Sequence, residues 1–485
     1  MKVERFVEVL ATWPTRPGAL HVKLSEAIAE AITQGTLLPG VRLPAERKLA
    51  GALSLSRTTV VTAYRRLRET GWLESRPGSG TWVSRVHAMR ARSDAHSSVV
   101  LKGTLLNLLQ VNDPSLIDLA MATPEPLAEM VEAAMERARE EIGELMRQRN
   151  YMPFGLHSLR RAVADFYTSS GTRTVPEQIL ITTGAQQAIS LIATLLVNRG
   201  DPVVVESPTY FGALEVLRFA GARISPVAMT KEHVAPEVLA RKIAAVRPRL
   251  VYLTPTWQNP TGATMPTHAR QQIARDAEQH EVPIVEDETL ADMTIRGSKP
   301  PLIASYSTTA PILSVGALSK LMCSGIRIGW IRGPVPLMMR LAKLKSSADL
   351  GSSLVTQAIA TELFSRIGEA RALRAVELRG KRDLVVEMIR SRGLDWSFEE
   401  PQGGMSLWLR LPQTDTQMLV QTALRHGVTI APGNRFSVDE SHGEFLRLPF
   451  LLHRESLAVG VERLIAAWRE LTGTRASQPA ECAMV

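Results

Sequence analysis

The chain has 485 residues, of which 45% are hydrophobic and 22% are charged, and its formal net charge is +9. This length predicts about two to four compact units, and the composition excludes a disordered or fibrous chain. The longest strongly apolar run, residues 188–197, is far shorter than the ~20 residues of a membrane span. Glu4 and Glu8 also interrupt any signal-peptide core. We therefore predict a cytoplasmic protein without a membrane anchor.

Cysteine content and charge distribution narrow the class further. Cys323 and Cys482 are too few for a disulfide framework, and no cysteine and histidine group has metal-ligand spacing, so we expect no metal site. Residues 1–100 carry 15 Lys and Arg against 8 Asp and Glu. This basic excess predicts a polyanionic partner for the first part of the chain, although a solvated basic surface has the same composition.

The first hundred residues carry a pattern of three helices. Apolar residues repeat at helical spacing before Gly35: Leu24, Ala27, Ile28, Ala31 and Ile32. A second, short helix follows Pro44, and Ser56 is placed to cap a third helix that runs to Gly71. In the third helix we expect Val60, Ala63, Tyr64 and Leu67 to face inward. The arginines and threonines of this helix are expected to be exposed, as in a recognition helix.

Two short strands, residues 72–75 and 81–83, are predicted around a glycine-rich tip at residues 76–80, which is the pattern of a wing. Leu43-Pro44-Ala45-Glu46-Arg47, Ser56-Arg57-Thr58-Thr59-Val60 and the wing together resemble the GntR family of winged helix-turn-helix domains. We place this domain at residues 15–85. The resemblance implies binding to double-stranded operator DNA. It assigns DNA contacts to Arg47, Ser56, Arg57, Thr58, Thr59, Arg76, Gly78 and Gly80.

Beyond a predicted exposed linker at residues 86–113, strands alternate with helices. Short apolar runs at residues 179–181, 203–205, 250–253 and 283–285 are typical of buried parallel strands in an α/β layer fold. We predict one domain at residues 114–472, with a large subdomain at about 150–334 and a small one at about 335–472. Residues 473–485 are expected to be a disordered tail.

Polar segments follow the predicted strands, where open α/β sheets place their ligand sites. Residues 183–187 open a helix whose N–H groups suit a phosphate, and residues 206–210 and 254–262 follow two further strands. Glu286-Asp287 closes a strand, and Lys320 and Arg327 lie seven residues apart. Singly, each residue also fits a structural role, but in this order they resemble fold-type I pyridoxal-phosphate enzymes of the aspartate aminotransferase class.

This resemblance implies pyridoxal 5'-phosphate as the cofactor. It assigns Lys320 to a Schiff base with the cofactor aldehyde and Asp287 to the pyridine nitrogen. It assigns Asn259 to the phenolic oxygen and Tyr210 to stacking on the ring. The phosphate falls to Ala185, Gln186, Ser319 and Arg327. Arg447 matches an arginine that grips a ligand carboxylate.

Two departures from this pattern concern residues around the cofactor. Thr289 and Leu290 stand where family members usually have a tyrosine that helps to hold the phenolic oxygen. Ala317 stands where a serine or threonine often binds phosphate. Both losses are expected to weaken the cofactor site or its catalytic tuning without removing the Schiff base.

A GntR-like winged helix followed by an aminotransferase-like domain is the arrangement of the MocR family of bacterial transcription regulators. The resemblance implies a homodimer in which binding of the cofactor, or of an amino acid or amine, alters DNA binding. Two alternatives remain open. One is an active aminotransferase with an attached DNA-binding domain. The other is a scaffold in which pyridoxal phosphate is structural and another ligand controls DNA binding.

Overall fold

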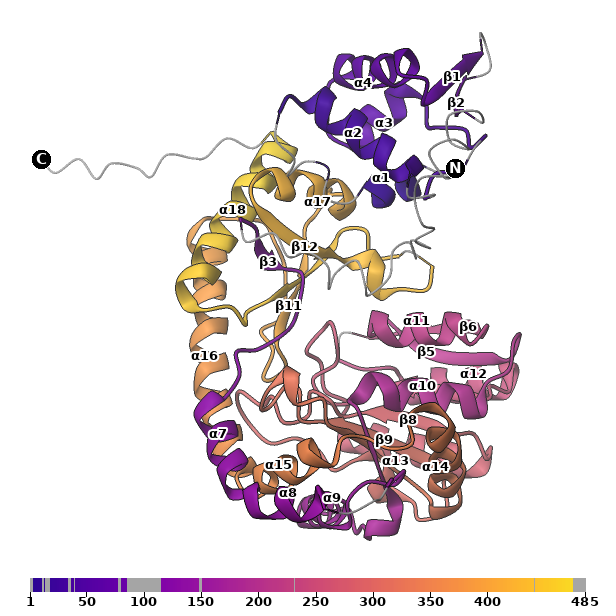
Figure 1. Ribbon diagram of the computed structural model, residues 1–485, viewed down its shortest axis with the longest axis vertical. Helices are drawn as coiled ribbons and strands as arrows, with labels where there is room; N and C mark the ends of the chain where they lie inside the picture. Colours follow the sequence, from indigo (N-terminus) through magenta and orange to yellow (C-terminus); the bar gives the residue numbers. More distant parts are fainter. Residues whose placement is uncertain are drawn as a thin grey trace, which may run out of the picture. The chain divides into compact units, whose positions relative to one another are not determined.

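A computed structural model describes residues 3–10, 13, 18–33, 36–38, 40–76, 80–84, 115–147, 151–230, 232–439 and 441–473 (Figure 1). By compactness the chain divides into two units. Unit 1 comprises Met1–Met121, Leu411–Pro432 and Ala458–Val485, and unit 2 comprises Ala122–Arg410 and Gly433–Leu457. The predicted domain ranges do not follow this division and remain predictions. The predicted linker, and the predicted tail after Gly473, lie outside the described residues.

Unit 1 opens with a small helical domain. Its elements are α1 (Val3–Leu10), α2 (Leu20–Thr33), α3 (Glu46–Ala52), α4 (Arg57–Glu69), β1 (Leu73–Arg76) and β2 (Gly80–Val83). The three predicted helices are present, and the two wing strands pair antiparallel, with Leu73 opposite Val83. Strand β1 begins at Leu73, one residue later than predicted. The sequence did not predict α1, whose Phe6 and Leu10 are buried in the same core.

Local chemistry explains the bounds of this domain. All five apolar positions predicted for the first helix are buried, as are the four predicted for the third helix. The Ser56 side chain caps α4 by accepting from the backbone N–H of Thr59 at 3.1 Å. The buried hydroxyl of Tyr64 in α4 donates to the carbonyl of Pro44 at 3.0 Å, so α4 is bonded to the segment before α3.

The remaining described part of unit 1 comes from distant stretches of the chain. Strand β3 (Ile117–Leu119) pairs parallel with β12 (Val428–Pro432), which follows α17 (Thr416–Arg425). Trp13 is fully buried, and its indole N–H donates to the side-chain oxygen of Gln421 on α17 at 2.7 Å. Residues near the amino terminus are thereby joined to a helix more than 400 residues later.

Unit 2 is built on a seven-stranded sheet of order β4-β10-β9-β8-β7-β5-β6. Its strands are β4 (Ile179–Thr182), β5 (Pro202–Ser207), β6 (Arg223–Ala228), β7 (Leu250–Leu253), β8 (Ile284–Asp287), β9 (Ile312–Ala317) and β10 (Gly329–Arg332). The pairs from β6 through β9 are parallel, whereas β10 is antiparallel to both of its neighbours. The sheet is therefore mixed: the apolar runs at residues 203–205, 250–253 and 283–285 lie in parallel pairs as expected, whereas the run at 179–181 lies in β4, which pairs antiparallel with β10.

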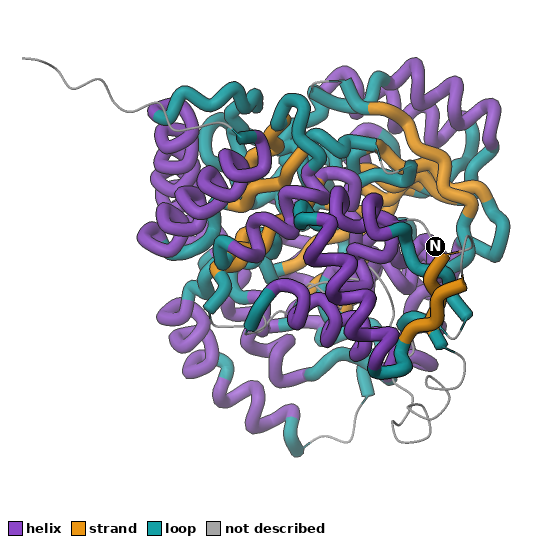
Figure 2. The backbone as a smooth tube through the Cα atoms, turned by 90° about the horizontal axis from the view of Figure 1, so that it is seen from above, coloured by secondary structure: helices purple, strands orange, loops and turns teal. Residues whose placement is uncertain are grey.

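Two hydrophobic cores cover the two faces of this sheet, because successive strand residues point to opposite sides. On β4, Ile179 and Ile181 join one core and Leu180 joins the other. The first core is covered by α7 (Ala128–Arg137), α8 (Arg139–Leu145), α9 (His157–Ser169), α12 (Pro236–Val246), α13 (Thr267–Gln279) and α15 (Leu354–Phe364). The second is covered by α10 (Ala185–Leu196), α11 (Phe211–Phe219) and α14 (Val335–Asp349). Figure 2 shows strands with helices around them.

The last described elements of the chain are helices and a pair of strands. They are α16 (Ile367–Ser391), the antiparallel pair β11 (Ser406–Arg410) and β13 (Phe445–Pro449), and α18 (Arg454–Thr472). Of the helices that the structure describes, none is both long and apolar enough to cross a membrane.

Candidate cofactor site and DNA-binding surface

The predicted cofactor residues of unit 2 follow the carboxyl ends of neighbouring strands. Asp287 is the last residue of β8, and Lys320 follows the end of β9. Tyr210 comes after β5, and Asn259 comes after β7. Because β5, β7, β8 and β9 are parallel, these ends meet at one edge of the sheet. The fold therefore brings four residues that span 110 positions of the sequence to one edge.

Lys320 carries the amine of the site. Its Nζ atom donates to the backbone carbonyl of Ala122 at 2.7 Å. Burial, together with the positive charges of Arg447 and Arg327, lowers the pKa of Lys320 from 10.5 to about 8. A larger fraction of this amine is therefore neutral at physiological pH than for an ordinary lysine, and the neutral amine is the form that attacks an aldehyde.

Asp287 is a buried carboxylate that accepts three hydrogen bonds. The hydroxyl of Tyr252 donates to its Oδ2 atom at 2.6 Å, and Thr289 donates to Oδ1 through its hydroxyl at 2.5 Å and its backbone N–H at 2.9 Å. Burial raises the pKa of Asp287, while these hydrogen bonds act in the opposite direction. The sequence analysis missed Tyr252 as a site residue. The signal was a tyrosine within an apolar strand, where its hydroxyl requires a polar partner.

Tyr210, Gln186, Asn259 and Arg447 contact one another in two pairs. The hydroxyl of Tyr210 donates to the side-chain oxygen of Gln186 at 3.2 Å. A guanidinium N–H of Arg447 donates to the side-chain oxygen of Asn259 at 3.4 Å. Arg447 is only 2% exposed, and its guanidinium lies 5.0 Å from the ring centre of Phe436. Asn259 thus adjoins the predicted carboxylate-binding arginine.

The predicted phosphate residues combine a helix N-terminus with a guanidinium group. Ala185 and Gln186 are the first two residues of α10. Ser319, which directly precedes Lys320, is buried. Gly184 precedes the helix with φ of +103°, and a side chain there would meet the Arg327 guanidinium at 2.8 Å. Arg327 also donates to the carbonyl of Thr183 at 2.7 Å. Helix N–H groups beside a guanidinium suit a phosphate dianion.

The residues present fit pyridoxal phosphate by the chemistry of their donor set. An amine with a lowered pKa, a buried carboxylate and a cationic cradle at a helix N-terminus are the three groups that this cofactor requires. The structure shows the surroundings of the three residues that depart from the family pattern. Thr289 is bound to Asp287, while Leu290 and Ala317 are buried. The Thr289 hydroxyl, which could replace the usual tyrosine hydroxyl, donates to Asp287 instead.

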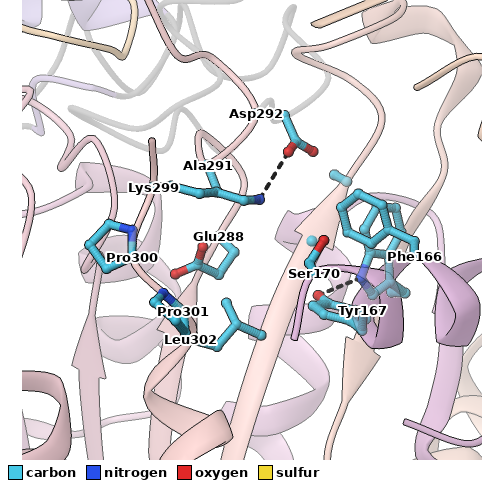
Figure 3. A pocket seen from close by; sticks show the side chains of 13 residues that line it. Phe166, Tyr167, Ser170, Glu288, Ala291, Asp292, Lys299, Pro300, Pro301 and Leu302 are labelled. Carbon is cyan, nitrogen blue, oxygen red and sulfur yellow. Dashed lines mark hydrogen bonds and ion pairs between the residues drawn. The ribbon is translucent and has the colours of Figure 1, made fainter. Parts of the chain in front are cut away.

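A separate cavity of about 80 Å³ lies in unit 2 against α9 and the segment 288–302 (Figure 3). Lys299 donates to Asp292 at 3.0 Å in this cavity, and the Trp330 indole donates to the hydroxyl of Tyr167 at 2.8 Å. Burial raises the pKa of Glu288, which also lines the cavity, to about 8. None of the predicted cofactor residues lines this cavity.

The predicted DNA contacts lie on and beside α4 and the wing. Arg47, Ser56, Arg57 and Thr58 are exposed, and Thr59 is half-buried. Arg76 ends β1 and Gly80 begins β2, whereas Gly78 lies outside the described residues. The Ser56 side chain is engaged in capping α4, which gives it a structural role as well.

Arg42 is a further cation of this surface that the sequence analysis missed. Its guanidinium lies 5.7 Å from the ring centre of Trp82 in the wing. A side chain at Gly80, whose φ is +119°, would meet Arg42 at 2.8 Å. The glycine therefore permits an arginine to lie against the base of the wing, a contact with no signal in the sequence because it joins distant segments.

Comparisons with known proteins identify a family for each of two regions of the chain. Residues 116–464 match the model of the family described as aminotransferase class I and II, and residues 20–83 match bacterial regulatory proteins, gntR family. The probable rhizopine catabolism regulatory protein MocR of Rhizobium meliloti is 29% identical, covering 86% of this chain and 87% of that protein. The 2-aminoadipate transaminase of Thermus thermophilus is 30% identical, covering 76% and 94%.

Among solved structures, the α-aminoadipate aminotransferase LysN of Thermus thermophilus, complexed with N-(5'-phosphopyridoxyl)-L-leucine, superposes with a TM-score of 0.69. It is 29% identical, and the match covers 75% of this chain and 94% of that one. The predictions of a GntR-type winged helix and a fold-type I domain are confirmed. The chain therefore belongs to the aminotransferase class I and II family, and its fused GntR-type domain makes it a MocR-type transcription regulator.

Proposed function

We propose that this regulator binds double-stranded DNA through its winged helix and holds pyridoxal phosphate covalently through Lys320. In this proposal, the cofactor or an amino compound captured at the same site alters DNA binding. The observation that carries the proposal is the position of Lys320 after β9 and of the buried Asp287 at the end of β8, at the same edge of the sheet, together with Arg447 and Arg327, whose charges help to lower the pKa of Lys320 to about 8. Strongly shifted pKa values of buried groups are more frequent at functional sites than elsewhere.

Each residue of the site has a distinct task in this proposal. When bound, pyridoxal phosphate supplies an aldehyde that captures primary amines and a ring that withdraws electrons. Lys320 supplies the attaching amine, and Asp287 keeps a proton on the pyridine nitrogen. Arg327 and the first N–H groups of α10 hold the phosphate. Arg447 binds a carboxylate of the amino compound, so the effector class is an amino acid or a related amine that carries a carboxylate.

The test begins with the visible absorption of the purified chain after addition of pyridoxal phosphate. A band near ~420 nm that is lost in Lys320→Ala would support covalent attachment, and the same spectrum in both proteins would contradict it. Binding of a duplex, selected from a random pool by the full chain, is then measured with and without the cofactor and amino acids. DNA affinity that never changes would exclude control through this site.

A second candidate function is transamination. The presence of Lys320, Asp287, Arg327 and Arg447 favours it, whereas Thr289 and Leu290 in place of the usual tyrosine argue against efficient turnover. Repeated conversion of an amino acid with a keto-acid acceptor would identify an enzyme. A regulator would stop after one equivalent of amino compound has been captured.

Assembly and location complete the proposal. We propose a homodimer, because helix-turn-helix domains commonly bind two half-sites as dimers and two DNA-binding heads require two chains. We propose a cytoplasmic location, because the proposed DNA partner is there. Light scattering of the chain at micromolar concentration tests the assembly, and a monomer at all concentrations would contradict it.

A further inference from the structure

Two buried residues, Glu206 and Gln258, join the loops that carry Tyr210 and Asn259. Glu206 is near the end of β5, four residues before Tyr210. Gln258 directly precedes Asn259 in the loop after β7. Each of the two is only 2% exposed. Neither is among the residues assigned to the cofactor.

The amide of Gln258 uses both of its ends across the two loops. Its Nε2 atom donates to Oε1 of Glu206 at 3.0 Å and to the carbonyl of Pro208 at 2.7 Å. Its Oε1 atom accepts from the backbone N–H of Thr261 at 3.0 Å and from the Thr261 hydroxyl at 2.7 Å. Both donors and both acceptor positions of the amide are therefore satisfied.

Glu206 ties the same amide to the sheet. Its Oε1 atom also accepts from the backbone N–H of Thr254, at the end of β7, at 3.0 Å. Burial raises the pKa of Glu206 to about 8, so at neutral pH the group is mostly uncharged. An uncharged carboxyl still accepts two hydrogen bonds through one oxygen, and it avoids the cost of a buried charge.

The need for such a contact follows from the sheet. The pairing of β5 with β7 runs from Val203 opposite Leu250 to Val205 opposite Tyr252. In the described residues this pairing does not continue past Val205 and Tyr252, so other contacts fix one loop against the other. Glu206 and Gln258 continue the connection past the last paired residues, into the segments from which Tyr210 and Asn259 project.

We propose that Glu206 and Gln258 form a clasp that sets the separation of Tyr210 and Asn259, and so act as positioning residues for the cofactor ring. This inference rests on the proposed function only in its last step, which is the assignment of Tyr210 and Asn259 to the cofactor ring. The clasp itself is a property of the chain without cofactor.

The first experiment therefore uses the full chain without cofactor. Hydrogen exchange of the Thr254 and Thr261 amides is measured in Glu206→Ala, Glu206→Gln and Gln258→Ala. Glu206→Ala is expected to speed exchange at Thr254 by about fivefold, because a hydrogen bond of this kind contributes about 1 kcal/mol. Gln258→Ala is expected to do the same at Thr261. Glu206→Gln keeps an acceptor oxygen and should behave as the wild type.

The second experiment titrates the cofactor absorption band with pH. A donor from Asn259 to the phenolic oxygen stabilises negative charge there, so its misplacement should raise the pH at which the band changes. We expect a rise of about one pH unit in Glu206→Ala and little change in Glu206→Gln.

Glu286→Ala is the matched control. Glu286 is also a buried acid, but it accepts from Ser314 at 2.6 Å and from the backbone N–H of Ile303 at 2.7 Å, and its neighbour Asp287 points to the opposite face. The Glu286→Ala variant should be less stable than the wild type, but its cofactor band should change at the same pH.

The outcomes separate the clasp from the proposed function. Unchanged exchange at Thr254 and Thr261 in the alanine variants would overturn the clasp, whatever the cofactor does. An equal band shift in Glu286→Ala would overturn its positioning role. A wild-type chain without any lysine-dependent band would overturn the proposed function and the positioning role together, while the exchange data would still decide whether the clasp exists.

Discussion

The hydroxyl of Tyr252 donates a hydrogen bond to the carboxylate of Asp287, and 2.6 Å separates the two oxygen atoms. Tyr252 lies on β7 and Asp287 ends β8, the next strand in the sheet. Both side chains are buried, so the bond forms where water does not compete. It offsets part of the cost of burying the carboxylate, which otherwise raises the pKa of Asp287.

Tyr252→Phe should weaken cofactor binding by about 5- to 10-fold, because it removes one hydrogen bond to a buried charged group. Without this donor the pKa of Asp287 rises further, and the pyridine proton is held less firmly. Titration of pyridoxal phosphate by its absorption measures the change. Tyr167→Phe, which loses the bond to Trp330 on the other face, serves as the control. Equal affinity in wild type and Tyr252→Phe would show that the hydroxyl has no such role.

The rate of cofactor attachment should depend on pH through Lys320. Its pKa is lowered from 10.5 to about 8, and only the neutral amine reacts, so the rate should rise with pH and level off above about 8. Stopped-flow absorption after mixing with pyridoxal phosphate gives this profile. A rate still rising steeply above pH 9 would mean that Lys320 titrates as an ordinary lysine.

Removal of the Arg447 charge should move this profile. Arg447 is the larger of the two charged causes that lower the pKa of Lys320, so Arg447→Gln should shift the midpoint to higher pH. Arg410→Gln, which breaks an exposed pair with Glu444, should leave the midpoint in place. The same midpoint in all three proteins would contradict electrostatic coupling between Arg447 and Lys320.

Arg447→Lys should separate effector binding from cofactor binding. Lysine keeps the charge but loses the planar pair of donors, so affinity for an amino acid should fall about tenfold while affinity for pyridoxal phosphate changes little. Spectral titration of the loaded protein with L-amino acids and with matching amines that lack a carboxylate measures both effects. If amines and amino acids lose affinity equally, Arg447 does not bind the carboxylate.

Two neighbouring residues of the winged helix should respond differently to substitution. Ser56→Ala removes the cap of α4 and should lower the free energy of unfolding by about 1 kcal/mol. Arg57→Ala should leave stability unchanged but weaken DNA binding and reduce its salt dependence, because Arg57 is exposed at the start of α4. Thermal denaturation and fluorescence anisotropy at several salt concentrations distinguish them. Loss of stability without loss of DNA affinity in Arg57→Ala would contradict this assignment.

The elements that depend on local chemistry could be predicted from the sequence. The apolar spacing of Leu24 to Ile32, the Ser56 cap and the glycine-flanked wing are local patterns, and the structure confirms each element they predict. The strand ends at Asp287 and before Lys320 were equally visible, because buried strands are short apolar runs with polar residues at their ends.

Contacts between residues far apart in the sequence could not be predicted, because they depend on how the whole chain packs. The antiparallel direction of β10 and the helix α1 were not predictable, because both depend on packing against elements far along the chain. The contacts of Tyr252 with Asp287 and of Gln258 with Glu206 join residues 35 and 52 positions apart. Such pairs leave no periodic signal in one sequence, since their geometry is set by strand order and burial, not by local propensity.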